Sequence, residues 1–75
     1  MNDRLFRTIL KRYEAAVEDA NYKIEIICKQ NLVIPEHIDI TGEIDKLLQI
    51  IAEAEDKLAV MRKYYGKKAT ESNIL

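Results

Sequence analysis

The sequence predicts an all-α fold, a long antiparallel helical hairpin, from two runs of apolar residues and the proline-containing segment between them. Each run repeats at alternating spacings of three and four residues, which keeps one apolar seam on one side of a helix. Pro35, the single proline of the chain, falls between the two runs and disfavours helix at the preceding residue. The first seam is Phe6, Leu10, Tyr13, Val17, Ala20, Ile24 and Ile27, and the second is Ile44, Leu47, Ile51, Ala54, Leu58, Met61 and Tyr65.

The first predicted helix covers about residues 3–30, and Asp3 is its expected N-cap because a short polar side chain can accept a hydrogen bond from the first turn. Asn31 is the expected stop, since Asn tolerates the left-handed conformation that ends many helices. Residues 31–40 form the expected connector.

The second predicted helix covers about residues 41–65, with Thr41 as its N-cap and Gly66 as the residue after its end. Glu43 and Asp45 lie near its start, where carboxylates favour the positive end of the helix dipole. Residues 1–66 are therefore expected to form a single hairpin domain, and residues 67–75 a polar C-terminal tail.

Composition indicates one small folded domain. The chain has 75 residues, of which 48% are hydrophobic and 33% charged, a balance that does not resemble disordered sequence. No apolar run approaches the ~18 residues that a membrane-spanning helix needs, and no export signal is legible. Cys28 has no second cysteine to pair with, which favours a reducing compartment and a cytoplasmic location. We expect Cys28 to be a small buried apolar residue beside Ile27.

Both predicted helices carry apolar residues outside their seams, including Leu5, Tyr22, Leu48 and Ile50. Two helices touch along only one line, so such residues face water in a monomer, and exposed apolar surface on this scale is typical of an association face. We therefore expect a homodimer that forms a four-helix bundle, or a higher oligomer of such dimers. Its expected core seam is Leu10, Val17, Ile24, Ile27, Leu47, Ile51 and Leu58.

Charge is divided unevenly along the predicted hairpin. The open end, where the first helix starts and the second ends, has eight basic and two acidic side chains, a net of +6, and the rest of the chain has a net of −7. This end either meets phosphates or an acidic protein surface, or lies on the acidic end of a partner in an antiparallel dimer. The candidate partner-binding residues are Arg4, Arg7, Lys11, Arg62, Lys63 and Tyr64.

Nucleic acid is the weaker alternative as a partner for this end. Tyr13, Tyr64 and Tyr65 lie near the basic residues, and aromatic rings among Lys and Arg can stack on unpaired bases. Tyr13 and Tyr65 nevertheless occupy seam positions, which leaves Tyr64 as the free aromatic residue. The net charge of −1 and the lack of a legible binding module also argue against nucleic acid.

Catalytic and metal-binding motifs are sparse. Glu36, His37 and Asp39 cluster near Glu43, but a zinc site usually needs several ligands at regular helical spacing. The sequence has no Gly-rich phosphate loop, no paired nucleophile and base, and no cysteine cluster. We therefore expect no bound metal, no cofactor and no enzymatic activity.

Two family resemblances bear on function. The stretch 41–48 resembles the start of the second helix in the Spo0E-like aspartyl-phosphate phosphatases, whose signature is Ser-Gln-Glu-Leu-Asp. Glu43 and Asp45 match that signature, whereas Thr41 and Gly42 replace its first two residues. The resemblance implies a helical hairpin that removes phosphate from a response regulator.

More of the chain is similar to small uncharacterised helical proteins of tailed phages, particularly marine ones. The residues that carry this similarity are Glu36-His37 and Asp39, 44–47 and 54–58. The resemblance implies a phage or host-cytoplasm setting and no particular activity.

The sequence as a whole favours a non-enzymatic, homo-oligomeric helical assembly or adaptor protein. Its main partner is expected to be another copy of itself, with a second protein at the basic end. The alternatives are a regulatory phosphatase that depends on Glu43 and Asp45, and a nucleic-acid accessory protein that uses the basic end.

Overall fold

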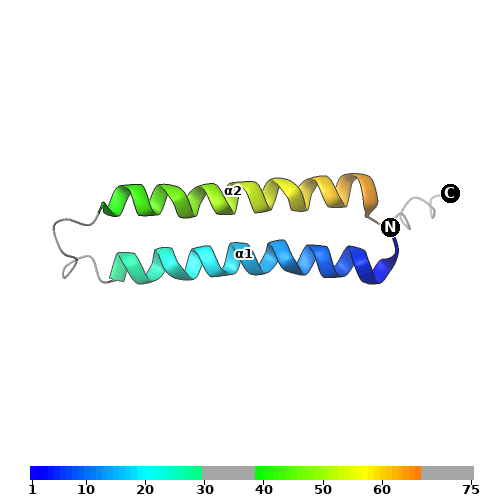
Figure 1. The fold of residues 1–75 in the computed structure, drawn as a ribbon, viewed down its shortest axis with the longest axis horizontal. Helices are drawn as coiled ribbons and strands as arrows, with labels where there is room; N and C mark the ends of the chain where they lie inside the picture. The colour runs from blue at the N-terminus through cyan, green and yellow to red at the C-terminus, as the bar shows by residue number, and fades with distance from the viewer. Residues whose placement is uncertain (30–38, 67–75) are drawn as a thin grey trace.

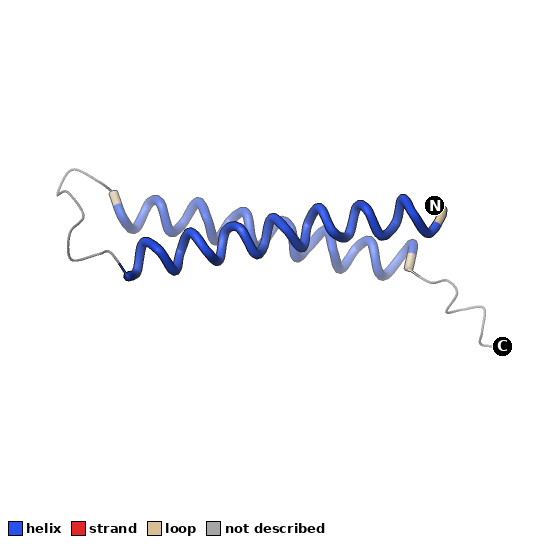
Figure 2. Tube along the Cα trace, turned by 90° about the horizontal axis from the view of Figure 1, so that it is seen from below, coloured by secondary structure: helices blue, strands red, loops and turns tan. Residues whose placement is uncertain are grey.

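A computed structural model of the chain describes residues 1–29 and 39–66, which form an antiparallel hairpin of two helices. Helix α1 spans Asp3–Lys29 and helix α2 spans Ile40–Tyr65, and the two lie side by side along their length (Figure 1 and Figure 2). The predicted all-α antiparallel hairpin is thus confirmed. The connector residues 30–38, which include Asn31 and Pro35, and the tail 67–75 lie outside the described residues.

Helix α1 begins one residue earlier, and helix α2 two residues earlier, than their predicted caps require. The N–H of Leu5 donates to Asn2 Oδ1 at 2.8 Å, so Asn2 caps α1 and Asp3 is its first helical residue. The N–H of Gly42 donates to Asp39 Oδ1 at 3.0 Å, so Asp39 caps α2. The predictions of Asp3 and Thr41 as caps were wrong because Asn and Asp, which cap as well as these residues, precede each of them.

Gly66 ends α2 as expected, but not in the left-handed conformation that usually explains a glycine there. Its backbone is extended, with φ −76° and ψ 150°, and its N–H donates to the carbonyl oxygen of Arg62 at 3.3 Å. A Cβ atom at this position would lie 2.6 Å from that same oxygen. Close approach of the backbone to the last helical turn, and not a positive φ, therefore favours glycine here.

The two predicted seams face each other, and the buried residues lie on them. Ala20 is buried in α1, and Leu47, Ala54, Leu58 and Met61 are buried in α2. The other seam residues are half-buried, except Tyr65, which is 51% exposed. Leu10, Val17, Ile24, Ile27 and Ile51 are among the half-buried residues.

Two seam-level expectations were wrong. Tyr65 is exposed because it lies in the last turn of α2. It faces Phe6, the first residue of the α1 seam, and no further seam residue of α1 follows to cover it. Cys28 is also exposed, because it lies one residue after the seam residue Ile27 and points about 100° away from it.

Two contacts between the helices define the two faces of the hairpin. Lys57 Nζ lies 5.3 Å from the ring centre of Tyr13, and Arg62 Nη2 lies 3.3 Å from Glu14 Oε2. Lys57 and Arg62 are five residues apart and so point about 140° from each other, on either side of the α2 seam. We call the side with the Lys57 contact the Tyr13 face and the side with the Arg62 contact the Glu14 face.

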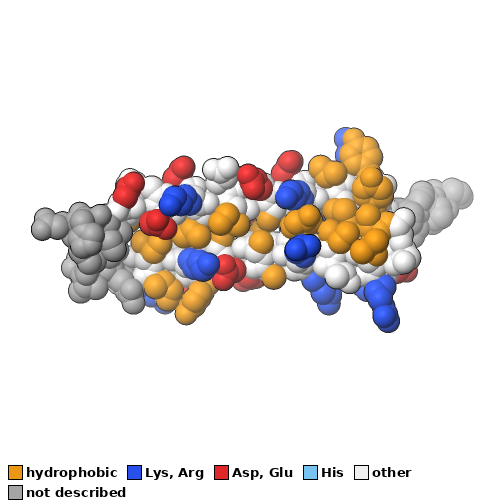
Figure 3. Space-filling model, viewed as in Figure 1, with side chains coloured by type: hydrophobic (Ala, Val, Ile, Leu, Met, Phe, Trp, Pro, Cys, Tyr) orange, Lys and Arg blue, Asp and Glu red, His pale blue; other side chains and the backbone are white. Residues whose placement is uncertain are grey.

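Apolar side chains are not confined to the interior. One face of the hairpin shows a band of apolar side chains between the helices that widens at the open end (Figure 3). Eight large apolar residues in the described part are exposed. They are Met1, Leu5, Tyr22, Leu48, Ile50, Val60, Tyr64 and Tyr65.

Candidate partner-binding site

The hairpin brings the predicted basic residues together at its open end. The start of α1 lies beside the end of α2 (Figure 1), because two antiparallel helices of 27 and 26 residues match in length. Arg4, Arg7 and Lys11 extend from α1, and Arg62 and Lys63 from α2, and all five are exposed. The chain thus assembles this basic cluster from residues that lie at opposite ends of its sequence.

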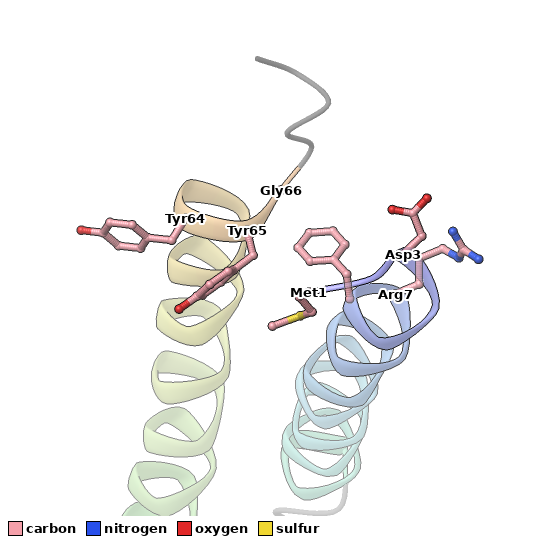
Figure 4. A pocket seen from close by; sticks show the side chains of 7 residues that line it. Met1, Asp3, Arg7, Tyr64, Tyr65 and Gly66 are labelled. Atoms are coloured by element: carbon pink, nitrogen blue, oxygen red, sulfur yellow. The ribbon is translucent and has the colours of Figure 1, made fainter. Parts of the chain in front are cut away.

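A pocket of about 400 Å³ opens between the two helix ends (Figure 4). The Tyr65 ring lies across α2, and the Tyr64 ring extends away from α1. Apolar side chains and charged groups of both signs therefore meet in one concave surface. Its lining residues are Met1, Asp3, Phe6, Arg7, Tyr64, Tyr65 and Gly66.

Two tyrosines and a lysine make an aromatic edge beside the pocket. The Tyr64 and Tyr65 ring centres are 6.5 Å apart with their planes tilted by 58°. Lys63 Nζ lies 5.3 Å from the centre of the Tyr64 ring, within the range of a cation–π contact. Tyr64 is nevertheless 64% exposed, so its ring is accessible to a partner, and so is that of Tyr65.

The ion pair between Arg62 and Glu14 changes the charge balance expected at this end. The sequence division placed Glu14 with the acidic remainder of the chain, but its carboxylate lies 3.3 Å from Arg62 Nη2. This pair offsets the Arg62 charge and leaves a smaller free basic cluster. Within residues 1–29 and 39–66, no carboxylate forms an ion pair with Arg4, Arg7, Lys11 or Lys63.

The sequence did not single out Met1, Phe6 or Tyr65 as residues of this site. Phe6 and Tyr65 were assigned to the seams, where apolar residues usually form core. The sequence nevertheless contains a signal for their place in the site, because Phe6 is the first residue of one seam and Tyr65 is the last residue of the other. The last pair of facing seam residues in an antiparallel hairpin lies at its open end, so core residues pack against this pair from one side only.

The residues of the phosphatase resemblance lie at the other end of the hairpin. Glu43 and Asp45 are exposed near the start of α2, and Glu43 Oε2 lies 3.5 Å from Lys46 Nζ. Glu36 and His37 lie outside the described residues. In the part of the chain that the structure describes, no three His, Cys, Asp or Glu side chains cluster as a metal site would require.

Neither α1 nor α2 is apolar enough over a sufficient length to cross a membrane. Comparison with known proteins gives no match, whether to a family model, a curated protein or a solved structure. The geometry of the hairpin therefore carries the functional argument. It defines a two-helix hairpin with apolar faces and a basic, aromatic open end.

Proposed function

We propose that this chain is a non-enzymatic assembly or adaptor protein that works as a homodimer, a four-helix bundle built from two hairpins, or as a higher oligomer of such dimers. The observation that carries the proposal is the amount of apolar surface left exposed. Eight large apolar residues in the described part are at least 44% exposed. A second hairpin packed on the first removes such surface from water, which stabilises the dimer.

The shallow interior supports the same proposal. Of the buried residues, only Ala20 is less than 2% exposed, and the other four retain 4% to 8%. Half-buried Ile9, Tyr13 and Ala16 follow one edge of the contact between α1 and α2, because each is three or four residues from the next. In a four-helix bundle this edge faces the centre of the bundle and becomes core.

We also propose that the open end of the hairpin binds a second protein, and that the surface of this second protein in the contact is acidic. Arg4, Arg7, Lys11 and Lys63 supply positive charge there, and Tyr64 and Tyr65 supply exposed aromatic area. Aromatic residues and arginine are enriched in the centres of protein interfaces.

The experiment has two parts. Sedimentation equilibrium of the full chain tests self-association, and the proposal predicts a dimer or a multiple of dimers. For the open end, the wild-type chain and an Arg7→Glu/Lys63→Glu variant are purified from cells with whatever they bind. A Lys23→Glu/Lys29→Glu variant is the matched control, because it reverses the same charge far from the open end.

The proposal expects a bound acidic protein with the wild-type and control chains and its loss from the open-end variant. Nucleic acid that is lost from the open-end variant alone would favour the nucleic-acid alternative. Phosphatase activity on a phosphorylated response regulator that Asp45→Ala abolishes would favour the enzymatic alternative.

A further inference from the structure

Four residues along one side of α1 form a pattern that complements itself when a second copy of the helix runs in the opposite direction. Leu5, Arg12, Asp19 and Ile26 are spaced seven residues apart, so they follow one side of the helix with a drift of about 20° per step. In order they are apolar, basic, acidic and apolar. An antiparallel copy of the same helix presents Ile26, Asp19, Arg12 and Leu5, which matches each residue with one of the same polarity or opposite charge.

This line lies on the Tyr13 face. Arg12 is two residues before Glu14 and so points about 200° around the helix from it, away from the Arg62–Glu14 pair. Lys57 reaches Tyr13 on this same side. On α2, Ile50 and Tyr64 lie seven residues before and after Lys57 and so share its side of the helix.

The Tyr13 face is large enough to support a dimer, and it carries more exposed large apolar side chains than the Glu14 face. Leu5, Ile50 and Tyr64 are 47%, 45% and 64% exposed, whereas on the Glu14 face Leu48 is the one exposed large aliphatic residue that we identify in the described part. The face of two adjacent helices about 40 Å long and about 20 Å wide covers roughly 800 Å², which is the usual contribution of one partner to a stable interface.

The pairs of opposite charges on the two helices are centred at the same level of the hairpin. Arg12 and Asp19 are centred between residues 15 and 16, and Glu53 and Lys57 are centred on residue 55. Because Lys57 lies opposite Tyr13 and the helices run in opposite directions, residue 55 lies at about the level of residue 15. One two-fold axis at this level therefore relates both pairs of opposite charges.

We propose that a second copy of this chain occupies the Tyr13 face in antiparallel orientation, with α1 against α1 and α2 against α2. Arg12 pairs with Asp19 of the partner subunit, and Lys57 pairs with Glu53 of the partner subunit. Each contact occurs twice, as a two-fold interface requires. This inference rests on the proposed homodimer and specifies its face and direction.

Arg12 and Asp19 are available for their pairing across this interface. Arg12 has no ion-pair partner within residues 1–29 and 39–66, and Asp19 pairs with Lys23 at 3.0 Å through a side chain that is still 61% exposed. The antiparallel arrangement also brings each basic open end toward the partner's Glu43 and the partner's Asp45. A parallel arrangement would instead place the two basic ends together.

Charge reversal at one pair provides the test. Arg12→Glu places like charges together twice in its own homodimer, and so does Asp19→Lys. An equimolar mixture of the two variants restores both pairs in a heterodimer, because Glu meets Lys in one contact and the native Asp19 meets the native Arg12 in the other. The double variant Arg12→Glu/Asp19→Lys restores both pairs within a homodimer.

Lys11→Glu and Glu18→Lys are the matched controls. Lys11 and Glu18 are also seven residues apart and carry the same charges as Arg12 and Asp19. Lys11 points about 100° away from Arg12, however, and Glu18 about 100° away from Asp19. Sedimentation equilibrium gives the Kd of each homodimer, and native mass spectrometry counts homodimers and heterodimers in each mixture. Circular dichroism confirms that each variant retains its helices.

We expect each test variant to weaken its homodimer about tenfold, and we expect the mixture to form heterodimers in preference to homodimers. The double variant regains the wild-type Kd, and the control mixture gives a statistical distribution. A wild-type dimer whose test mixture is statistical would overturn this interface but leave the proposed homodimer intact. Preferential heterodimers in the control mixture would also overturn it, and a wild-type monomer would overturn both proposals.

Discussion

Lys57 Nζ lies 5.3 Å from the centre of the Tyr13 ring and joins α2 to α1 near the middle of the hairpin. The contact fixes the level at which the two helices meet and marks one of the two faces of the hairpin. The Arg62–Glu14 pair, at 3.3 Å, marks the other face. Together the two contacts show how each helix is rotated, and therefore on which face an exposed side chain lies.

The contact between Lys57 and Tyr13 should contribute measurably to stability. A double-mutant cycle of Lys57→Met and Tyr13→Leu should show a coupling free energy of about 0.5–1 kcal/mol, the usual range for an exposed cation–π contact. Guanidinium denaturation of the four proteins measures it. The same cycle with Lys11→Met in place of Lys57→Met is the control, and equal coupling in the two cycles would refute the contact.

Leu58 should matter far more for folding than Leu48. Leu58 is 7% exposed and Leu48 is 51% exposed, so truncation leaves a cavity only at Leu58. We expect Leu58→Ala to lower the free energy of unfolding by about 2–4 kcal/mol and Leu48→Ala to lower it by less than about 1 kcal/mol. Similar losses in urea denaturation would contradict the placement of the seam.

The cap of α2 predicts a difference between two neighbouring polar residues. Asp39 accepts the hydrogen bond from the Gly42 N–H, so Asp39→Ala should cost about 1 kcal/mol of stability. Thr41→Ala removes only a hydroxyl that donates to Asp39 at 3.2 Å and should cost less. Thermal unfolding followed by circular dichroism compares them, and a larger loss for Thr41→Ala would restore Thr41 as the cap.

Exposed apolar residues on the two faces should differ in their effect on association. Ile50 lies on the Tyr13 face and Leu48 on the opposite side of α2, and both are about half exposed, at 45% and 51%. We expect Ile50→Ser to raise the Kd of the homodimer about tenfold, since burial of one aliphatic side chain is worth about 1.5–3 kcal/mol. Leu48→Ser should leave the Kd unchanged, and the reverse order would place the partner on the Glu14 face.

Most of the fold could be predicted from the sequence because it depends on one strong signal. The alternating three- and four-residue spacings of the two seams place Leu47, Ala54, Leu58 and Met61 in the interior, where the structure has them. The helix ends were harder to predict, since Asn2 and Asp39 compete with equally suitable caps one or two residues later. Choosing between them depends on backbone geometry that no periodicity reveals.

The candidate site was only partly accessible to sequence reasoning. The basic residues could be assembled at the open end because an antiparallel hairpin requires it. The Arg62–Glu14 pair could not be foreseen, because it depends on the rotation of each helix about its own axis. Tyr65 is exposed for another reason, its place in the last turn of α2, and there it lines the pocket with Phe6.

Native mass spectrometry of the protein purified gently from cells shows whether the full chain associates with itself. We predict two copies of the 8.7 kDa chain, or a larger even number, in every species, with or without a bound acidic protein. A species of 8.7 kDa at every concentration, or one copy bound to a foreign protein or nucleic acid, would contradict it. In that case the exposed apolar faces belong to a different partner.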